Sequence, residues 1–194
     1  MTTPGADFLK GTSLFLVGMM GSGKTTTGQH LARQLGYRFV DTDQLIEQTT
    51  GTAIKDIFAA QGEAAFRQIE TQVLAQVSAY TRLVVATGGG VVLAQKNWSY
   101  LFHGAVVWLD APLELLQQRL AADTERPLIQ GEAGLQKLQT LLEQRRSRYS
   151  QADVQVPVRA EDSVDAIANR TLELLAQRVK PQQQPPQYAD GGEG

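Results

Sequence analysis

Residues 14–31 read LFLVGMMGSGKTTTGQHL and pass from an apolar run, through three glycines and a lysine, into helix-forming residues. The apolar run predicts a buried strand, and residues 24–35 predict the helix that follows it. Between the two, residues 18–25 fit GxxxxGK[ST], in the strand-to-helix context in which this pattern cradles phosphates. The stretch therefore predicts a nucleotide-binding loop at the start of a helix.

Each part of this loop has a predicted task. Backbone N–H groups of the glycine-rich segment point toward phosphate oxygens at the positive end of the helix. Lys24 reaches the β- and γ-phosphates, and Thr25 offers its hydroxyl to Mg²⁺. The alternative, a glycine-rich turn with a surface lysine, is disfavoured by the strand-to-helix context. The predicted ATP-binding residues of the loop are Gly21, Ser22, Gly23, Lys24, Thr25 and Thr26.

Composition narrows the class of protein further. The sequence holds no Asn-Lys-x-Asp element for reading guanine, so ATP is the predicted nucleotide and a small kinase the predicted class. The 194 residues carry a formal net charge of −2 and no cysteine, which excludes disulfides and thiol catalysis and disfavours nucleic-acid binding. No stretch resembles a membrane span or a secretory signal, so we expect a cytoplasmic protein with no membrane partner.

Short apolar segments alternate with helical ones, which predicts an α/β fold with a parallel sheet and helices on both faces. The predicted strands are 13–17, 38–40, 83–86, 105–109 and 154–158. The predicted helices are 24–35, 44–48, 54–61, 63–80, 112–121, 135–150 and 164–179. We expect one domain over residues 1–180, a loop or mobile lid at about 121–134, and a disordered Pro/Gln/Gly-rich tail at 181–194.

Two carboxylates follow the second predicted strand, in the stretch FVDTDQLIE at residues 39–47. Because binding crevices of open α/β sheets lie at the carboxyl ends of the strands, Asp41 and Asp43 are candidates for the site. One carboxylate would hold Mg²⁺ through water, and the other would accept a hydrogen bond from the acceptor hydroxyl. The alternative for Asp43 is a helix cap, and the pair alone leaves both interpretations open.

A cation with aromatic neighbours comes next along the chain. Arg67 lies on a predicted helix beside Phe66, and Phe58 comes from the preceding helix. A guanidinium next to aromatic rings suits a small ring that carries a carboxylate. The alternative is a solvated ion pair between Arg67 and Glu70, which would contribute only about 0.2–0.5 kcal/mol.

The third predicted strand runs into a glycine triplet, Gly88–Gly90. Three consecutive glycines remove all side chains and let backbone amides approach a ligand closely, which a plain tight turn rarely requires. Three arginines further along the chain are additional candidates for contacts with anionic groups: Arg119, Arg126 in TERPL, and Arg145.

Taken in order, these motifs resemble those of the shikimate kinases. They are GMMGSGKTT, DTDQLIE, TGTAIKDIF, GEAAFRQIE, TGGG, TERPL and an arginine four residues before Tyr149, and they extend over about residues 14–149. Small gluconate and adenylate kinases share the first motif but not the series. The resemblance implies a three-layer P-loop fold like that of nucleoside monophosphate kinases, with a five-stranded parallel sheet in the order 2-3-1-4-5 and a lid.

The resemblance also implies roles for residues. The catalytic residues would be Asp43, beside the reacting hydroxyl, with Lys24 and Arg126. The substrate contacts, centred on a segment at about 42–70, would be Asp43, Arg67, Gly88, Gly89, Gly90, Arg145, Phe58 and Phe66. ATP would also contact Arg119 near the adenine and Arg126 from the lid, and Mg²⁺ would contact Thr25 and, through water, Asp41.

The activity implied by the resemblance is ATP-dependent phosphorylation of the 3-hydroxyl of shikimate by a monomer, on the route to chorismate and the aromatic amino acids. Two rivals remain open: a kinase for another polyol acid such as gluconate, and a kinase-like protein that binds without turnover. One motif departs from the family. The shikimate kinases commonly have Arg-x-Pro-Leu-Tyr where residues 145–149 read RRSRY, which changes the packing around Arg145.

Overall fold

The computed structural model describes residues 7–121 and 131–179, and its centre is a five-stranded sheet. Neighbouring strands all pair in parallel, in the order β2-β3-β1-β4-β5. This confirms the predicted fold class and the strand order that the resemblance implies. The strands, each within one residue of its predicted bounds, are β1 (Leu14–Val17), β2 (Arg38–Asp41), β3 (Leu83–Ala86), β4 (Ala105–Asp110) and β5 (Val154–Pro157).

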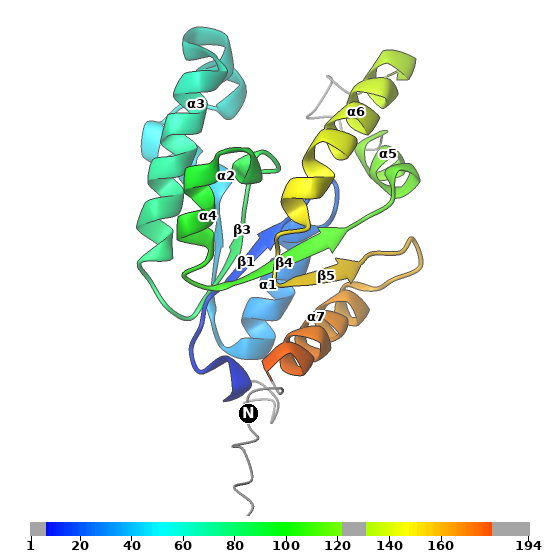
Figure 1. The fold of residues 1–194 in the computed structure, drawn as a ribbon. Helices are drawn as coiled ribbons and strands as arrows, with labels where there is room; N and C mark the ends of the chain where they lie inside the picture. The colour runs from blue at the N-terminus through cyan, green and yellow to red at the C-terminus, as the bar shows by residue number, and fades with distance from the viewer. Residues whose placement is uncertain (1–6, 122–130, 180–194) are drawn as a thin grey trace, which may run out of the picture.

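Helices cover both faces of the sheet, which gives the three predicted layers (Figure 1). On one face, α1 and α7 pack against each other and the sheet; α3, α4 and α6 lie on the other. Two 3₁₀ turns, η1 (Asp7–Leu9) and η2 (Val91–Leu93), complete the described elements. The helices are α1 (Lys24–Leu35), α2 (Thr42–Thr50), α3 (Ile54–Ser78), α4 (Gln95–Leu101), α5 (Leu113–Ala121), α6 (Gly131–Tyr149) and α7 (Val164–Val179).

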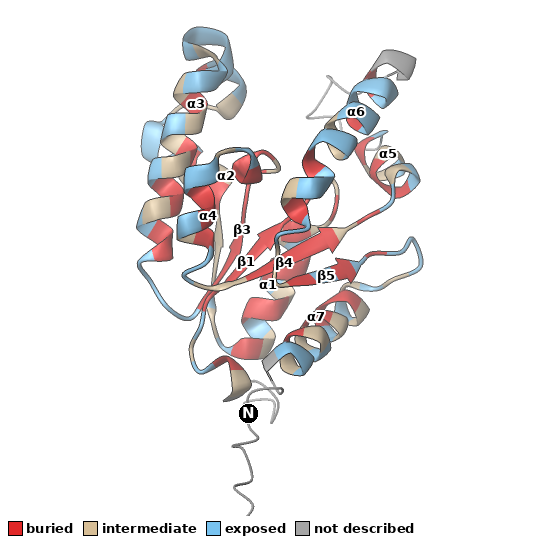
Figure 2. Ribbon diagram, in the orientation of Figure 1, coloured by how far each residue is buried: buried red, intermediate tan, exposed pale blue. Residues whose placement is uncertain are grey.

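Burial follows the position of each strand in the sheet (Figure 2). Every residue of β1 and β3 is buried, as expected for apolar strands covered by helices on both faces. The edge strand β5 alternates between buried and exposed residues, and the other edge strand, β2, is only partly buried. The two buried central strands, β1 and β3, therefore hold the loops at their carboxyl ends, and these loops contain the predicted site residues.

Some helix boundaries differ from those predicted, and one helix, α4, was not predicted. Tertiary hydrogen bonds hold α4 in place: Asn97 Nδ2 donates to the Val91 carbonyl at 2.8 Å and Trp98 Nε1 donates to the Val92 carbonyl at 3.1 Å. A helix of seven residues with no capping side chain has little local signal. Helix α6 begins at Gly131 instead of residue 135, and α2 extends beyond its predicted 44–48 at both ends.

The break predicted between residues 61 and 63 is present inside the continuous element α3. Gly62 there has φ 81° and ψ 173°, a conformation that glycine adopts without the penalty that a Cβ atom brings. The segment after the break, which carries Phe66 and Arg67, therefore starts a new helical run that ends at Ser78.

Two predictions concern parts of the chain that the structure does not describe. The tail at 181–194 and most of the expected lid at 121–134 lie outside the described residues. Within residues 7–121 and 131–179, no helix combines the length and the apolar composition needed to cross a bilayer.

The start of α7 is held by a two-point ion pair. Arg170 donates from Nη1 and Nη2 to the two carboxylate oxygens of Asp162, at 2.7 and 2.9 Å, while Ser163 caps the helix by accepting from the Ala166 N–H at 3.1 Å. The hydrogen bonds from Arg170 lower the pKa of Asp162 from 3.8 to about 2. Because the pKa is lower in the folded chain, the pair stabilises the fold above pH ~4, and this stabilisation is lost as the pH falls toward 2.

Replacing Asp162 with Asn should therefore lower the free energy of unfolding at neutral pH by about 1 kcal/mol, after allowance for solvent screening. The difference from the parent should shrink as the pH falls from about 4 toward 2. Urea unfolding across this pH range measures it, with Glu161→Gln at the exposed neighbouring position as the control. If the loss of unfolding free energy in Asp162→Asn did not change with pH, then the ion pair between Asp162 and Arg170 would not be its cause.

Candidate active site

The loop between β1 and α1 has the geometry of a phosphate cradle. Gly21 has φ 78° and Gly23, which caps α1, has φ 93°, so both lie in the region that favours glycine. Lys24 is buried, and its Nζ donates to the carbonyl oxygens of Gly18 at 2.9 Å and Met19 at 2.8 Å. The lysine thus lies across the loop, with its ammonium group hydrogen-bonded to two of the loop's carbonyl oxygens.

Asp41 joins the phosphate loop to the start of α2. Its Oδ2 accepts a hydrogen bond from Thr25 Oγ1 at 2.8 Å, and its Oδ1 accepts from the backbone N–H groups of Asp43 at 3.0 Å and Gln44 at 3.4 Å. Asp41 is therefore the cap of α2, and the alternative interpretation of Asp43 as that cap is wrong. The side chain of Asp43 lies in the first turn of α2.

The glycine triplet after β3 is the meeting point of the predicted substrate residues. A Cβ atom added to Gly88 would lie 2.8 Å from both Asp43 Oδ1 and Glu70 Oε1. A Cβ atom on Gly90 would overlap the guanidinium of Arg67. Side chains from α2 and α3 thus press directly onto the backbone of this loop, and the space needed by any larger residue is already taken.

Arg145 approaches the same loop from α6. A Cβ atom on Gly89 would lie 3.5 Å from Arg145 Nη1, from the Gly18 carbonyl oxygen and from the Met20 backbone nitrogen. Arg145 is buried, and its Nη1 donates to the Gly89 carbonyl at 3.2 Å. The triplet therefore lies next to both the phosphate loop and Arg145.

Arg67 is held by two carboxylates of its own helix. Nη1 donates to Glu70 Oε2 at 2.9 Å, while Nε and Nη2 donate to Glu63 Oε1 at 3.3 and 3.1 Å. The guanidinium carbon lies 5.2 Å from the centre of the Phe66 ring, which contacts the Phe58 ring at 4.6 Å between centroids. The Arg67–Glu70 pair considered from the sequence is thus present, but it is not a solvated pair, because the Glu70 side chain is only 1% exposed.

Glu70 places a second carboxylate close to Asp43. Burial raises the pKa of the Glu70 carboxyl above its ordinary value; the Arg67 guanidinium opposes this shift, and the nearby Asp43 carboxylate adds to it. Glu70 Oε1 has no hydrogen-bond partner within the described part of the chain. A carboxylate oxygen that is buried without a partner is costly, and it faces the space beside Gly88 where Asp43 also lies.

Tyr149 holds the backbone of the glycine triplet in place. Its hydroxyl, on a fully buried side chain, donates to the Gly89 carbonyl at 2.6 Å, and its ring stacks on Trp108 with 5.8 Å between centroids. Burial raises the pKa of Tyr149 to about 12, so this donor keeps its proton throughout the physiological range. Tyr149 lies four residues after Arg145 on one face of α6, and both side chains donate to the same carbonyl oxygen.

The remaining residues predicted to bind ATP differ in their contacts and burial. Arg119 Nη1 donates to the Gly21 carbonyl at 3.1 Å, which puts this arginine over the phosphate loop. Ser22 is buried within the loop, and Thr26 is exposed in the first turn of α1. Arg126 lies outside the described residues.

The donor set beside the phosphate loop fits Mg²⁺. The Thr25 hydroxyl and the Asp41 carboxylate lie within hydrogen-bond distance of each other, and hard oxygen donors of this kind suit that ion. Across the described ranges, three or more acidic, histidine or cysteine side chains nowhere gather as a metal site would require. Such a sparse set agrees with an ion that keeps several waters and is held largely by nucleotide phosphates.

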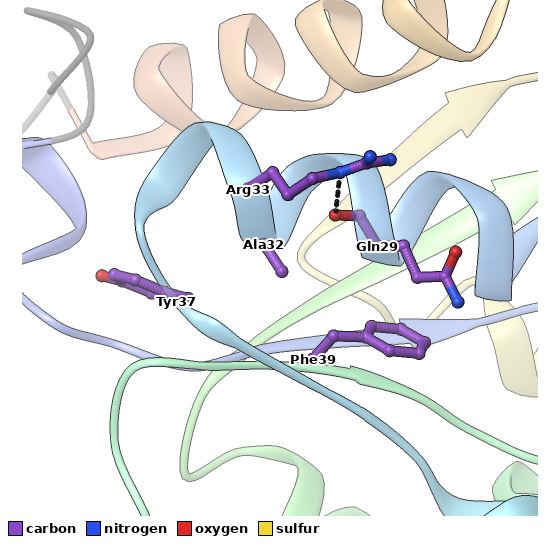
Figure 3. A pocket seen from close by; sticks show the side chains of 5 residues that line it. All are labelled: Gln29, Ala32, Arg33, Tyr37 and Phe39. Atoms are coloured by element: carbon purple, nitrogen blue, oxygen red, sulfur yellow. Dashed lines mark hydrogen bonds between the residues drawn. The ribbon is translucent and has the colours of Figure 1, made fainter. Parts of the chain in front are cut away.

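A surface hollow of about 400 Å³ lies elsewhere, over the C-terminal half of α1 and the start of β2 (Figure 3). It is lined by Gln29, Ala32, Arg33, Tyr37 and Phe39. The phosphate loop precedes the opposite end of α1, so this hollow is separate from the residues that the sequence analysis selected.

Two contributors to this site were not identified from the sequence: Glu63 as a partner of Arg67, and Tyr149 as a donor to the Gly89 carbonyl. Glu63 lies four residues before Arg67, and Tyr149 lies four residues after Arg145, so the sequence already places each pair on one face of a helix. Glu70 is buried and Glu63 is exposed because of how α3 packs against other elements, and no local sequence pattern predicts this difference.

Comparison with known proteins agrees with this geometry. The model of the family described as shikimate kinase matches residues 20–176. A shikimate kinase of Nostoc sp. (strain PCC 7120 / SAG 25.82 / UTEX 2576) is 54% identical over 175 residues, which cover 90% of this chain and 97% of that protein.

Solved structures give the same result. Shikimate kinase from Acinetobacter baumannii in complex with shikimate has a TM-score of 0.79 and 37% identity, with 93% of this chain and 100% of that chain covered. A gluconokinase from Sinorhizobium meliloti 1021 reaches a TM-score of 0.54 at 23% identity over 86% of this chain and 93% of that chain, a likeness of fold alone.

Proposed function

This chain belongs to the shikimate kinase family, and on that premise we propose that the phosphate loop and the glycine triplet form one active site. The reaction is the family's: ATP phosphorylates shikimate to give shikimate 3-phosphate and ADP, in the biosynthesis of the aromatic amino acids. The assignment of roles to residues is our proposal. The observation that supports it best is the convergence of Asp43, Arg67 and Arg145 on the triplet beside the phosphate loop.

The substrate would bind between these residues. Arg67 and Arg145 would hold its carboxylate, because guanidinium groups form the strongest hydrogen bonds with carboxylates. The contacting rings of Phe58 and Phe66 would pack against the carbon ring, and backbone amides around Gly89 would reach its polar groups. The substrate-binding segment at about 42–70 thus supplies the acid, the cation and the aromatic wall.

Asp43 would orient the reacting hydroxyl and accept its proton. Its Oδ1 lies beside Gly88, two residues before Gly90, where the guanidinium of Arg67 contacts the same loop. Phosphoryl transfer requires little covalent chemistry from the protein, so the positioning of the hydroxyl and the neutralisation of charge account for most of the rate.

Charge on the transferring phosphoryl group would be neutralised by Lys24 from the loop and Arg126 from the proposed lid, while Arg119 would lie near the adenine. Thr25 would contact Mg²⁺ directly and Asp41 through water; the ion, when bound with ATP, neutralises phosphate charge. To donate to a phosphate, Lys24 must give up its hydrogen bonds to the Gly18 and Met19 carbonyls.

We also propose that residues 1–180 act as one monomeric domain in the cytoplasm. What supports this is that side chains from α2, α3 and α6 of one chain all meet at the same loop. Light scattering on the purified protein at micromolar concentration measures the oligomeric state, and a dimer would contradict this part of the proposal.

The activity is tested by coupling ADP release to NADH oxidation, with shikimate, gluconate or no acceptor present. We expect release that depends on shikimate and an equivalent yield of shikimate 3-phosphate. ADP release that is equal with gluconate would favour the polyol-acid rival, and binding of shikimate without ADP release would favour the rival that lacks turnover.

Arg67→Ala should weaken shikimate binding by about tenfold to a hundredfold, because a charge-assisted hydrogen bond contributes roughly 1.5–3 kcal/mol. Titration calorimetry with shikimate measures the change, and the affinity for ADP should stay near that of the parent. The matched control is Arg148→Ala, at a partly exposed position of α6 that contacts Gln95. Equal affinities for shikimate in Arg67→Ala and the parent would remove Arg67 from the carboxylate site.

A further inference from the structure

Both donor edges of the Arg67 guanidinium are already occupied by carboxylates. Glu63 Oε1 accepts from Nε at 3.3 Å and Nη2 at 3.1 Å, while Glu70 Oε2 accepts from Nη1 at 2.9 Å. The edge formed by Nε and Nη2 presents two parallel donors, which is the arrangement that matches a carboxylate group. A substrate carboxylate that approaches this edge therefore meets Glu63 first.

The two acidic partners differ sharply in their freedom to move. The Glu70 side chain is 1% exposed and lies against Gly88, so its carboxylate cannot leave Arg67 without disturbing the packing there. The Glu63 side chain is 64% exposed and can rotate into water. Exposed ion pairs four residues apart on a helix are weak, so this contact can be broken at small cost.

The backbone at Glu63 also sets it apart. It directly follows Gly62, whose φ of 81° breaks the helix, so Glu63 is the first residue of the helical run that carries Arg67. From this position its side chain reaches Arg67, one helical turn later on the same face.

We propose that Glu63 is a built-in occupant of the carboxylate-binding edge of Arg67 and that the carboxylate of the substrate displaces it on binding. This rests on the proposed role of Arg67 in holding that carboxylate. Before binding, Glu63 and Glu70 neutralise the arginine; on binding, the acid of the substrate takes the place of Glu63, and Glu70 stays. Glu63 thus sets the affinity for the acid by competing with it.

If Glu63 competes with the substrate carboxylate for Arg67, then removing its charge should change the affinity in the opposite direction from that expected for a positioning role. If Glu63 only held Arg67 in the correct orientation, then weakening the contact would weaken substrate binding. If it competes, then weakening the contact strengthens binding, because less interaction must be given up. The sign of the change in affinity therefore separates the two roles.

The test is Glu63→Gln, which keeps the length of the side chain and removes its charge. We expect the Kd for shikimate, measured by calorimetry, to fall by about twofold to fivefold, the range that corresponds to an exposed ion pair. KM for shikimate should fall with it, and kcat should change less than KM. A cyclohexene triol without the carboxyl group does not engage this edge, so its inhibition constant should stay unchanged.

Asp56→Asn is the matched control, because it removes one negative charge from an exposed position on the same helix. It should leave the Kd for shikimate at the parent value, which shows that general attraction of an anion does not account for the effect. In the Arg67→Ala background, Glu63→Gln should have no effect on the Kd, since the contested cation is gone.

A raised or unchanged Kd in Glu63→Gln overturns the inference, as does an equal gain in Asp56→Asn. Failure of the proposed function is distinguishable from this, because it appears in the Arg67→Ala variant alone. If Arg67→Ala leaves the Kd for shikimate unchanged, then the carboxylate site itself is misassigned. If Arg67→Ala weakens binding and Glu63→Gln does not strengthen it, then only the competition is wrong.

Discussion

Lys24→Met should reduce turnover by at least about 10²–10³-fold, the typical cost of removing one group that stabilises charge in a transition state. Methionine has nearly the same length and fills the buried space, but it cannot neutralise the β- and γ-phosphates. Steady-state ADP release with saturating shikimate measures the loss. Shikimate affinity should stay near the parent value, because the proposed partners of its carboxylate, Arg67 and Arg145, lie outside the loop.

The variant has a second expected effect, on stability. Lys24 Nζ donates to the carbonyl oxygens of Gly18 and Met19, and these two hydrogen bonds are lost on substitution. Since a hydrogen bond contributes about 0.5–1.5 kcal/mol, the melting temperature should fall by a few degrees while the chain stays folded. Near-normal turnover in the folded variant would end the assignment of this loop as the phosphate site.

Asp43→Asn should lower kcat by about 10²–10⁴-fold, the usual contribution of general-base catalysis. The amide nearly preserves the shape of the carboxylate, but it cannot accept the proton of the reacting hydroxyl. Because Asp41, and not Asp43, caps α2, the substitution leaves the helix start intact. The loss should therefore appear in kcat, with the melting temperature and ATP binding close to those of the parent.

Two comparisons make this result specific. Asp56→Asn removes the same charge from an exposed site in the first turn of α3 and should keep kcat unchanged. Glu70→Gln tests whether the neighbouring buried carboxylate accepts the proton in place of Asp43. If Asp43→Asn keeps its kcat while Glu70→Gln loses it, then the proton goes to Glu70.

Local patterns sufficed for the frame of the molecule. Apolar runs bounded by turn residues marked all five strands, and the loop from Gly18 to Thr25 could be placed because it needs one strand, one turn and one helix in succession. The same holds for the break at Gly62 and for Gly36, which ends α1 with φ 65°. In each case the residues that determine the structure are neighbours in the sequence.

Features that depend on packing between distant segments were harder to predict. The local sequence pattern left open which of Asp41 and Asp43 caps the helix, and the structure separates them by the backbone N–H groups that donate to Asp41 and by the contact of Asp43 at Gly88. The burial of Glu70 likewise follows from how α3 meets the glycine triplet. Such distinctions arise from tertiary contacts, which propensity and periodicity do not encode.

The length of helix α6 would amplify any rotation at its C-terminal end. Its C-terminal end is fastened to the glycine triplet by Arg145 and Tyr149, and its first residue, Gly131, directly follows residues 122–130 in the chain. Nineteen residues of α-helix make a rod about 28 Å long, so a tilt of about 10° about the fastened end carries Gly131 through roughly 5 Å. A small rotation of α6 at the glycine triplet would therefore move Gly131 by several ångströms.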